Sequence, residues 1–181
     1  MIYAVIAAGG IGSRMGNLEK PKQYLTLKDK PIIAHTVEKF YVNSYFQKVI
    51  ILCPEQWVNH TKSILKKHIG EDERIVVLEG GSTRNESFKN ALDYINKTFP
   101  DCEKIIENNA ACPMITPELI DEFMSLLDEY DYVNTAYKIT DALGSYKDRI
   151  ANREDFYLIQ APDAYRFPLL YKHFDKDSEL C

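Results

Sequence analysis

A glycine-rich loop directly behind a short apolar run is the feature that most constrains the fold of this chain. Residues 2–7 (IYAVIA) are apolar and include β-branched side chains, which is typical of a buried strand in a parallel sheet. Gly9, Gly10 and Gly12 follow, and without a Cβ their backbone N–H groups can turn toward a ligand. Ligands of open α/β sheets bind at the carboxyl ends of the strands. The segment therefore predicts an α/β fold with an anion-binding loop.

Two positive charges follow the glycines. Arg14 supplies a permanent charge with a fixed fork of donors, and Lys22 supplies a compact charge on a mobile stem. A polyanion such as a nucleoside triphosphate is the expected ligand. The dinucleotide-binding motif fits poorly because Met15 stands where its third glycine is needed, and the Gly-Lys-Ser/Thr of a phosphate-binding loop is missing.

A tight turn without a ligand is the alternative explanation of this loop. It accounts for one or two glycines, but not for three glycines together with Arg14 and the tripeptide Pro21-Lys22-Gln23. We therefore favour the ligand-binding interpretation.

Strand and helix patterns alternate along the rest of the chain. Expected strands are residues 49–52, 75–78, 104–108 and 132–137, and expected helices include 31–42 and 117–128. Such βαβ alternation predicts a Rossmann-like, open and mostly parallel sheet with helices on both faces. With 181 residues and 45% hydrophobic content, the chain is expected to form a single domain.

A second glycine loop follows the predicted strand at residues 75–78. Gly80 and Gly81 permit close approach to a flat base, and the hydroxyl groups of Ser82 and Ser87 can bond to its amide edge. The alternative is a helix start capped by Ser82 or Thr83. Arg84 either binds the triphosphate or braces the loop.

Composition excludes several other classes of function. The net charge is −5 with no basic stripe, so nucleic-acid binding is disfavoured. No apolar stretch is long enough to span a membrane, and no basic leader precedes the first strand, so a cytoplasmic protein without membrane association is expected. The four cysteines lack metal-binding spacing and are expected to be reduced thiols.

Several motifs together resemble those of one enzyme family. Segments 7–16 (AAGGIGSRMG), 21–25 (PKQYL), 30–33 (KPII), 80–85 (GGSTRN) and 160–162 (QAP) are similar to cytidylyltransferases of the 2-C-methyl-D-erythritol 4-phosphate and ribitol-5-phosphate group. Residues 57–61 (WVNHT) and the opening MIYA resemble the ribitol-5-phosphate branch more closely. The resemblance implies transfer of CMP from CTP to a polyol phosphate, with release of pyrophosphate and with Mg²⁺ as cofactor.

The resemblance also implies roles for individual residues. Arg14 and Lys22 match the catalytic positions, and we assign Arg14 to the leaving phosphates and Lys22 to the α-phosphate. The implied nucleotide-binding residues are Ala7, Ala8, Gly9, Gly10, Gly12, Gly80, Gly81, Ser82, Arg84 and Ser87. A protruding dimerisation arm is expected at residues 138–153, where Asp141 and Arg153 match acceptor-binding positions. In relatives this arm completes the site of the other subunit, which implies a homodimer.

The chain departs from the family at the acceptor and metal positions. The family motif His-Asp-x-x-Arg-Pro is replaced by residues 108–113 (NNAACP), so Asn109 is a weak metal ligand in place of a carboxylate, and Glu107 is the hypothetical substitute. Cys112 replaces an arginine, and the family's carboxyl-terminal segment is not matched. Transfer to ribitol-5-phosphate is the preferred interpretation, and two alternatives stay open: the same chemistry on 2-C-methyl-D-erythritol 4-phosphate or another acceptor, and a catalytically impaired CTP-binding homologue.

Overall fold

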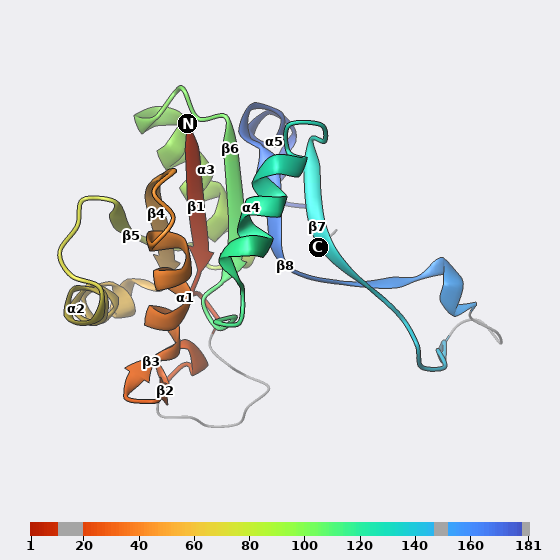
Figure 1. Ribbon diagram of the computed structural model, residues 1–181, viewed down its shortest axis with the longest axis horizontal. Coiled ribbons are helices and arrows are strands. Elements are labelled where there is room, and N and C mark those ends of the chain that lie inside the picture. The colour runs from red at the N-terminus through yellow and green to blue at the C-terminus, as the bar shows by residue number, and fades with distance from the viewer. Residues whose placement is uncertain (11–19, 147–151, 179–181) are drawn as a thin grey trace.

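The computed structural model of the protein describes residues 1–10, 20–146 and 152–178. A six-stranded sheet in the order β5-β4-β1-β6-β8-β7 forms the centre of the fold (Figure 1). Its strands are β1 (Ile2–Ala7), β4 (Phe46–Cys53), β5 (Ile75–Glu79), β6 (Lys104–Asn109), β7 (Tyr132–Lys138) and β8 (Tyr157–Arg166). β1 is parallel to β4 and β6, and β4 is parallel to β5, whereas β8 is antiparallel to both β6 and β7. The prediction of a mostly parallel α/β sheet is confirmed.

Helices cover both faces of the sheet, as expected. One face packs against α1 (Ile32–Tyr41), α2 (Val58–His68) and α4 (Pro117–Leu126), and the other against α3 (Arg84–Thr98) and α5 (Phe167–His173). β1 shows the alternation that this requires: Ala4 and Ile6 join the first core, and Tyr3 and Val5 join the second. All four side chains are buried, so β1 is the centre of both cores.

Several predicted boundaries differ from the observed ones. α4 begins as expected at Pro117, with Thr116 as N-cap, but it ends at Leu126 and not at residue 128. β4 begins three residues earlier than predicted, at Phe46. Short elements were also missed: the 3₁₀ turns η2 (Lys22–Tyr24) and η3 (Glu55–Trp57), and the small ribbon of β2 (Thr26–Leu27) and β3 (Lys30–Pro31).

β8 is the largest element that the sequence pattern did not predict. Its first four residues are exposed and only its centre is buried, so it shows no continuous apolar run. It also contains Pro162, which cannot donate a ladder hydrogen bond. The pairing with β7 shifts between Asn134 and Thr135, from Asp163 to Gln160, so Ala161 and Pro162 lie at this irregularity.

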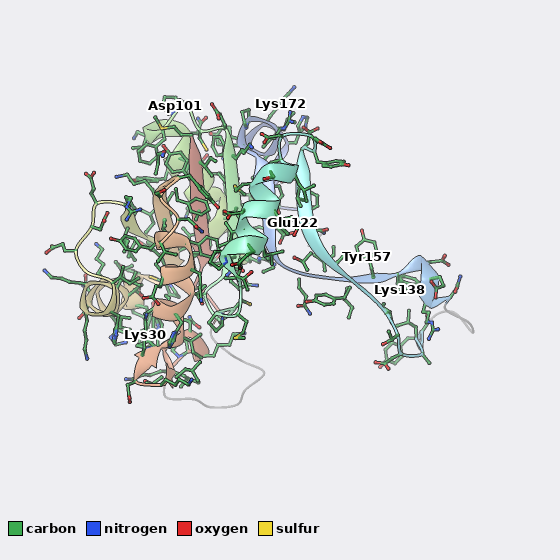
Figure 2. All side chains as sticks on the ribbon, in the orientation of Figure 1. Lys30, Asp101, Glu122, Lys138, Tyr157 and Lys172 are labelled. Carbon is green, nitrogen blue, oxygen red and sulfur yellow. The ribbon has the colours of Figure 1, made fainter. Side chains whose placement is uncertain are left out.

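The distal parts of β7 and β8 project away from the body of the molecule (Figure 1). Lys138 and Tyr157 lie on this projection, well outside the two cores (Figure 2). The turn η4 (Arg153–Asp155) belongs to the same region. A protrusion is therefore present in the expected part of the chain. Its role in dimerisation stays a prediction.

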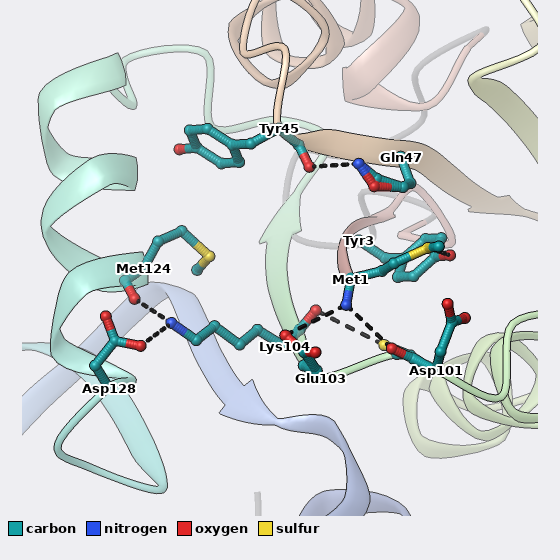
Figure 3. A network of polar contacts seen from close by, with 10 residues as sticks. Met1, Tyr3, Tyr45, Gln47, Asp101, Glu103, Lys104, Met124 and Asp128 are labelled. Carbon is teal, nitrogen blue, oxygen red and sulfur yellow. Dashed lines mark hydrogen bonds and ion pairs between the residues drawn. The ribbon is translucent and has the colours of Figure 1, made fainter.

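Polar contacts fasten the amino-terminal edge of the sheet (Figure 3). The amino group of Met1 donates to the carbonyl of Asp101 at 3.0 Å and lies 3.4 Å from a carboxylate oxygen of Glu103. Lys104 Nζ donates to the carbonyl of Met124 and to Asp128 Oδ1. The opposite edge, where the parallel strands end, is thus left for the two glycine loops.

Among the described residues, no helix combines the length and the apolar character that crossing a membrane requires.

Candidate active site

The two glycine loops leave the same edge of the sheet. Ala8 N donates to the Leu52 carbonyl at 2.7 Å, directly after β1 ends. Gly80 N donates to the Cys53 carbonyl at 2.9 Å, directly after β5 ends. Since Leu52 and Cys53 are the last two residues of β4, this strand joins the beginnings of both loops. The topology therefore brings the predicted phosphate loop and the predicted base loop together.

The first loop is open where the described part ends. A Cβ built on Gly9 or on Gly10 meets no atom within 4 Å, so packing of the described residues does not demand glycine there. Ala7 and Ala8 lie at the end of β1, and Ala8 is buried. The space above the two glycines is compatible with close approach of a ligand to the backbone.

Gly12 and Arg14 lie outside the described residues. Their predicted roles in binding the triphosphate stay predictions.

Lys22 lies at the start of the turn η2, and its side chain is exposed. No described residue forms an ion pair or hydrogen bond with its ammonium group, so the charge is available for a phosphate. The next residue, Gln23, is buried and its Nε2 donates to the Ala8 carbonyl at 2.6 Å. Gln23 thereby fixes Lys22 beside the first loop. Gln23 belongs to the PKQYL motif, but its contact with Ala8 was not predicted from the sequence.

The second loop is held by its own side chains. Thr83 is the N-cap of α3 and accepts from Glu86 N, while Glu86 Oε2 accepts from both the backbone N–H and the hydroxyl of Ser82. Ser87 Oγ accepts from Gly81 N at 2.9 Å and donates to the Thr83 carbonyl at 2.8 Å. These bonds form a reciprocal capping arrangement at the start of the helix.

The interpretation as a capped helix start is confirmed for Thr83, whereas binding of the base by the second loop stays a prediction. The structure assigns the cap to Thr83, and it places the Ser87 hydroxyl inside the loop, where it braces Gly81. Gly81 itself is required, because a Cβ there would lie 2.3 Å from Glu86 Cβ. Ser82 is exposed, and its hydroxyl oxygen can still accept from a ligand, although its N–H and hydroxyl proton are bound by Glu86 and the Gly80 N–H is bound by the Cys53 carbonyl.

Arg84 braces the second loop against the sheet. Its Nη2 donates to Glu107 Oε1 on β6 at 3.2 Å, and Glu107 is buried. Asp163 on β8 is paired with Glu107 across the antiparallel ladder and accepts from the Tyr132 hydroxyl at 2.7 Å. Burial raises the pKa of both carboxyl groups, and the nearby Arg84 charge opposes the shift. Asp163 was not predicted from the sequence, although its position directly after the QAP motif is a signal that could have identified it.

The described residues by themselves do not form a magnesium site. Glu107 and Asn109 share one face of β6, as the sequence suggested, but the Glu107 carboxylate is bound by Arg84. Asn109 offers only an uncharged amide, whereas Mg²⁺ in proteins is held by carboxylates together with phosphates and water. Within residues 1–10, 20–146 and 152–178, no three histidine, cysteine, aspartate or glutamate side chains are grouped to hold a metal ion.

Asn108, at the position of the family's histidine, has an unsatisfied polar atom. Its side chain is 1% exposed, and its Nδ2 donates to the Asn109 carbonyl at 3.3 Å. Its Oδ1 has no hydrogen-bond partner among the described residues. A buried amide oxygen without a partner is costly, so this atom is suited to a donor from water or from a ligand.

The predicted acceptor residues lie on the projection and not beside the two loops (Figure 1). Arg153 Nη1 donates to the Thr140 carbonyl at 2.6 Å, and Arg153 Nε lies 3.6 Å from Glu154. Asp141 is exposed in the neighbouring bend. Cys112 is partly buried as a free thiol in the turn after β6. One chain by itself therefore does not bring Asp141 and Arg153 to Lys22.

An open, mostly parallel sheet with two glycine loops and a free lysine at its carboxyl edge defines a nucleotide-binding α/β protein. A family model described as "IspD: 2-C-methyl-D-erythritol 4-phosphate cytidylyltransferase" matches residues 2–180. The chain belongs to this family, whose members are cytidylyltransferases and therefore nucleotidyltransferases.

Solved structures agree with this assignment. The 4-diphosphocytidyl-2C-methyl-D-erythritol synthase of Anaerococcus prevotii DSM 20548 has a TM-score of 0.80 at 23% identity, over 99% of this chain and 78% of that one. The bifunctional IspDF of Campylobacter jejuni has a TM-score of 0.81 at 25% identity, and the match covers 99% of this chain and 44% of that one. The 2-C-methyl-D-erythritol 4-phosphate cytidylyltransferase of Francisella tularensis gives 0.76 at 26% identity, over 96% and 76%. These likenesses confirm the fold.

Proposed function

We propose that this protein transfers CMP from CTP to a polyol phosphate and releases pyrophosphate. The observation that carries the proposal is Lys22, which is exposed, has no ion-pair or hydrogen-bond partner among the described residues, and is held beside the first glycine loop by Gln23. Membership in the cytidylyltransferase family supports the nucleotide and the type of transfer.

The proposed reaction needs no covalent enzyme intermediate. An oxygen of the acceptor phosphate attacks the α-phosphorus of CTP and forms the new P–O bond, while the bond from that phosphorus to the bridging oxygen of the β-phosphate breaks. The bridging oxygen leaves with pyrophosphate and carries the displaced charge. The protein's part is to align two anions and to stabilise the charge that develops between them.

Lys22 is proposed to perform the second of these tasks. An ammonium group near the α-phosphate offsets the negative charge of the approaching acceptor and of the transition state. The two glycine loops are proposed to bind the remainder of the nucleotide, with the phosphates over Gly9 and Gly10 and the base over Gly80 to Ser82. Arg14 is proposed to bind the leaving phosphates.

The acceptor is proposed to be 2-C-methyl-D-erythritol 4-phosphate, for which the matching family and the Francisella tularensis relative are named. Ribitol-5-phosphate is the second candidate, because residues 57–61 resemble that branch and pack beside the turn that carries Lys22.

The test is pyrophosphate release from each common nucleoside triphosphate, with and without Mg²⁺, against both polyol phosphates and a control without acceptor. Release with CTP and one acceptor supports the proposal and identifies the acceptor. The comparison with and without Mg²⁺ tests the predicted cofactor, which the described residues alone do not hold. Binding of CTP without release under any condition would support the catalytically impaired homologue, which Asn109 and Cys112 favour.

We also propose a homodimer in which the projection reaches the partner's site. Its side chains Tyr137, Phe156, Tyr157, Leu158 and Ile159 are each more than half exposed, which is unusual for apolar groups on two neighbouring strands. Dimerisation would also carry Asp141 and Arg153 to a second active site, where they would bind the acceptor phosphate.

Sedimentation of Ile159→Asp tests the dimer. The variant is expected to sediment as a monomer, whereas Val42→Asp, which changes an exposed apolar side chain on the body, keeps the wild-type state. A monomeric wild-type protein would contradict the proposal.

A further inference from the structure

Four side chains from two distant parts of the chain meet behind the turn that carries Lys22. The Tyr24 ring stacks on Trp57, with centroids 4.7 Å apart and planes 21° from parallel. His60 lies 5.3 Å from each ring, with its plane steeply inclined to both. The Tyr24 hydroxyl lies 2.8 Å from Thr61 Oγ1. We call Tyr24, Trp57, His60 and Thr61 the aromatic clamp.

The hydrogen bond at the base of the clamp has a defined direction. Thr61 Oγ1 donates to Cys53 Sγ at 3.6 Å, so its single proton is used there and the Tyr24 hydroxyl donates to Thr61. Tyr24 is 4% exposed, and Thr61 and Cys53 are fully buried. Burial raises the pKa of Tyr24, which keeps the phenol protonated and able to donate.

The clamp and Gln23 hold the Lys22 turn from two sides. Gln23 fastens the turn to the first glycine loop through the Ala8 carbonyl, and Tyr24 fastens it to α2. Both anchors are within two residues of Lys22, whose own side chain is exposed and forms no ion pair or hydrogen bond with a described residue. The backbone position of Lys22 is therefore determined by buried contacts to Ala8, directly after β1, and to α2.

We propose that the aromatic clamp positions Lys22 for the transfer reaction, with Tyr24 and Thr61 acting as positioning residues through the turn. This inference rests on the proposed function, because it assigns the clamp a part in the rate of that reaction. It also gives residues 57–61 a physical role that their resemblance to one branch of the family does not.

The test uses variants that remove one hydrogen bond and leave the packing intact. Thr61→Val and Tyr24→Phe each delete a hydroxyl, and Thr61→Ser retains it. Thr61→Val is expected to lower kcat about tenfold while KM for CTP changes less than about twofold, since a small displacement of a catalytic group reduces the rate more than it reduces binding. Thr61→Ser is expected to restore most of kcat.

The double variant separates positioning from general damage. If both hydroxyl groups act through one bond, Tyr24→Phe combined with Thr61→Val lowers kcat no further than the stronger single variant. Ile95→Val, a small change in the core on the other face of the sheet, is the stability control and is expected to keep the wild-type kcat. Additive losses, or an unchanged kcat in Thr61→Val, would overturn the proposal.

A second measurement does not depend on turnover. The backbone NMR order parameter of the Lys22 amide is expected to be about 0.85 in the wild type and in Thr61→Ser, and to fall clearly in Thr61→Val. If the wild type releases no pyrophosphate with any acceptor, the proposed function fails, and this order parameter alone decides whether the clamp fixes the turn. An order parameter that is equal in Thr61→Val and wild type would overturn the proposal that the aromatic clamp positions Lys22.

Discussion

The second glycine loop, here called the base loop, and the turn that carries Lys22 are held in opposite ways. In the base loop, residues 80–87, every bracing bond of Ser82, Thr83 and Ser87 joins positions no more than six residues apart. In the Lys22 turn, the buried bonds reach over 15 residues, from Gln23 to Ala8, and over 37 residues, from Tyr24 to Thr61.

This difference follows from what each loop must do. A loop that begins a helix can use the helix's own unpaired N–H groups as partners, so a local sequence is sufficient. A lysine that must face a phosphate cannot bind its own neighbours, and its backbone has to be fixed by contacts with other elements. We therefore expect the base loop to be robust and the lysine turn to depend on the whole fold.

The largest expected effect is that of the lysine itself. Lys22→Ala removes the free charge and is expected to lower kcat by about a hundredfold to a thousandfold, with a much smaller change in KM for CTP. Steady-state kinetics measure both constants. Lys97→Ala, which removes an exposed lysine from α3, is the charge-matched control. A change confined to KM would mean that Lys22 contributes uniform binding and not transition-state stabilisation.

Glycine substitutions compare the two glycine loops with each other. Gly81→Ala places a Cβ against Glu86 and is expected to raise KM for CTP about tenfold and to lower the thermal midpoint, because overpacking costs about 1–3 kcal/mol. Gly10→Ala meets no described atom, so its thermal midpoint is expected to stay near that of the wild type. A rise in KM for Gly10→Ala without any loss of stability would then locate the nucleotide over the first loop.

Removing one brace from each loop tests the local and distant anchors. Gln23→Met leaves the buried Ala8 carbonyl without its donor and is expected to lower the free energy of unfolding by about 1–3 kcal/mol. Ser87→Ala is expected to cost less than about 1 kcal/mol, because water can reach the Gly81 N–H in the exposed loop. Chemical denaturation measures both. Equal losses would contradict the distinction between the loops.

The smallest expected effect concerns the ion pair between Arg84 of the base loop and Glu107 of β6. Burial raises the pKa of Glu107, so the folded protein binds this proton more tightly than the unfolded chain, whose value is near 4.5. The contribution of Glu107 to the free energy of unfolding therefore falls as pH rises from about 4.5 toward the raised pKa.

Glu107→Gln removes this titration and is expected to flatten that part of the stability profile, measured by denaturation between pH 4.5 and 7. Arg84, Asp163 and Tyr165 are the charged or titratable groups beside Glu107, and they remain in the variant. Glu118→Gln, a change at an exposed glutamate of α4, is the control. An unchanged slope would show that Asp163 or another group dominates the pH dependence.

The strand predictions succeeded where a strand carries apolar residues in a row. β1 and β5 are almost entirely apolar, β4 ends in the run VIILC, and β6 carries Ile105 and Ile106, because helices cover both faces of these strands. β8 was missed because half of it is exposed and Pro162 interrupts its pairing. The short turn η2 has no periodicity of its own, and it exists because Gln23 and Tyr24 are anchored elsewhere.

The candidate site shows the same division. Motifs predicted Lys22, the glycines of both loops and, as an alternative for the second loop, a helix cap at Ser82 or Thr83. The structure places Gly9, Gly10, Gly80 and Gly81 at one edge of the sheet, holds Lys22 beside the first loop and assigns the cap to Thr83, while Gly12 lies outside the described residues. Glu107 was predicted as a substitute metal ligand, but the structure pairs it with Arg84, a partner 23 residues away that no spacing rule indicates. Gln23, Tyr24, Thr61 and Asp163 were not predicted, since each acts through a residue distant in sequence.

The sequence by itself determined the α/β class, the positions of the buried strands along the chain, the two glycine loops and the lysine, because strand burial, glycine and capping chemistry are properties of neighbouring residues. Only the tertiary structure decided which charges are free and which are bound. Lys22 is exposed because its neighbours are anchored to β1 and α2, and Arg84 is engaged because β6 presents Glu107 beneath it. Pairing of charged groups depends on distances in space, which the order of residues along the chain does not contain.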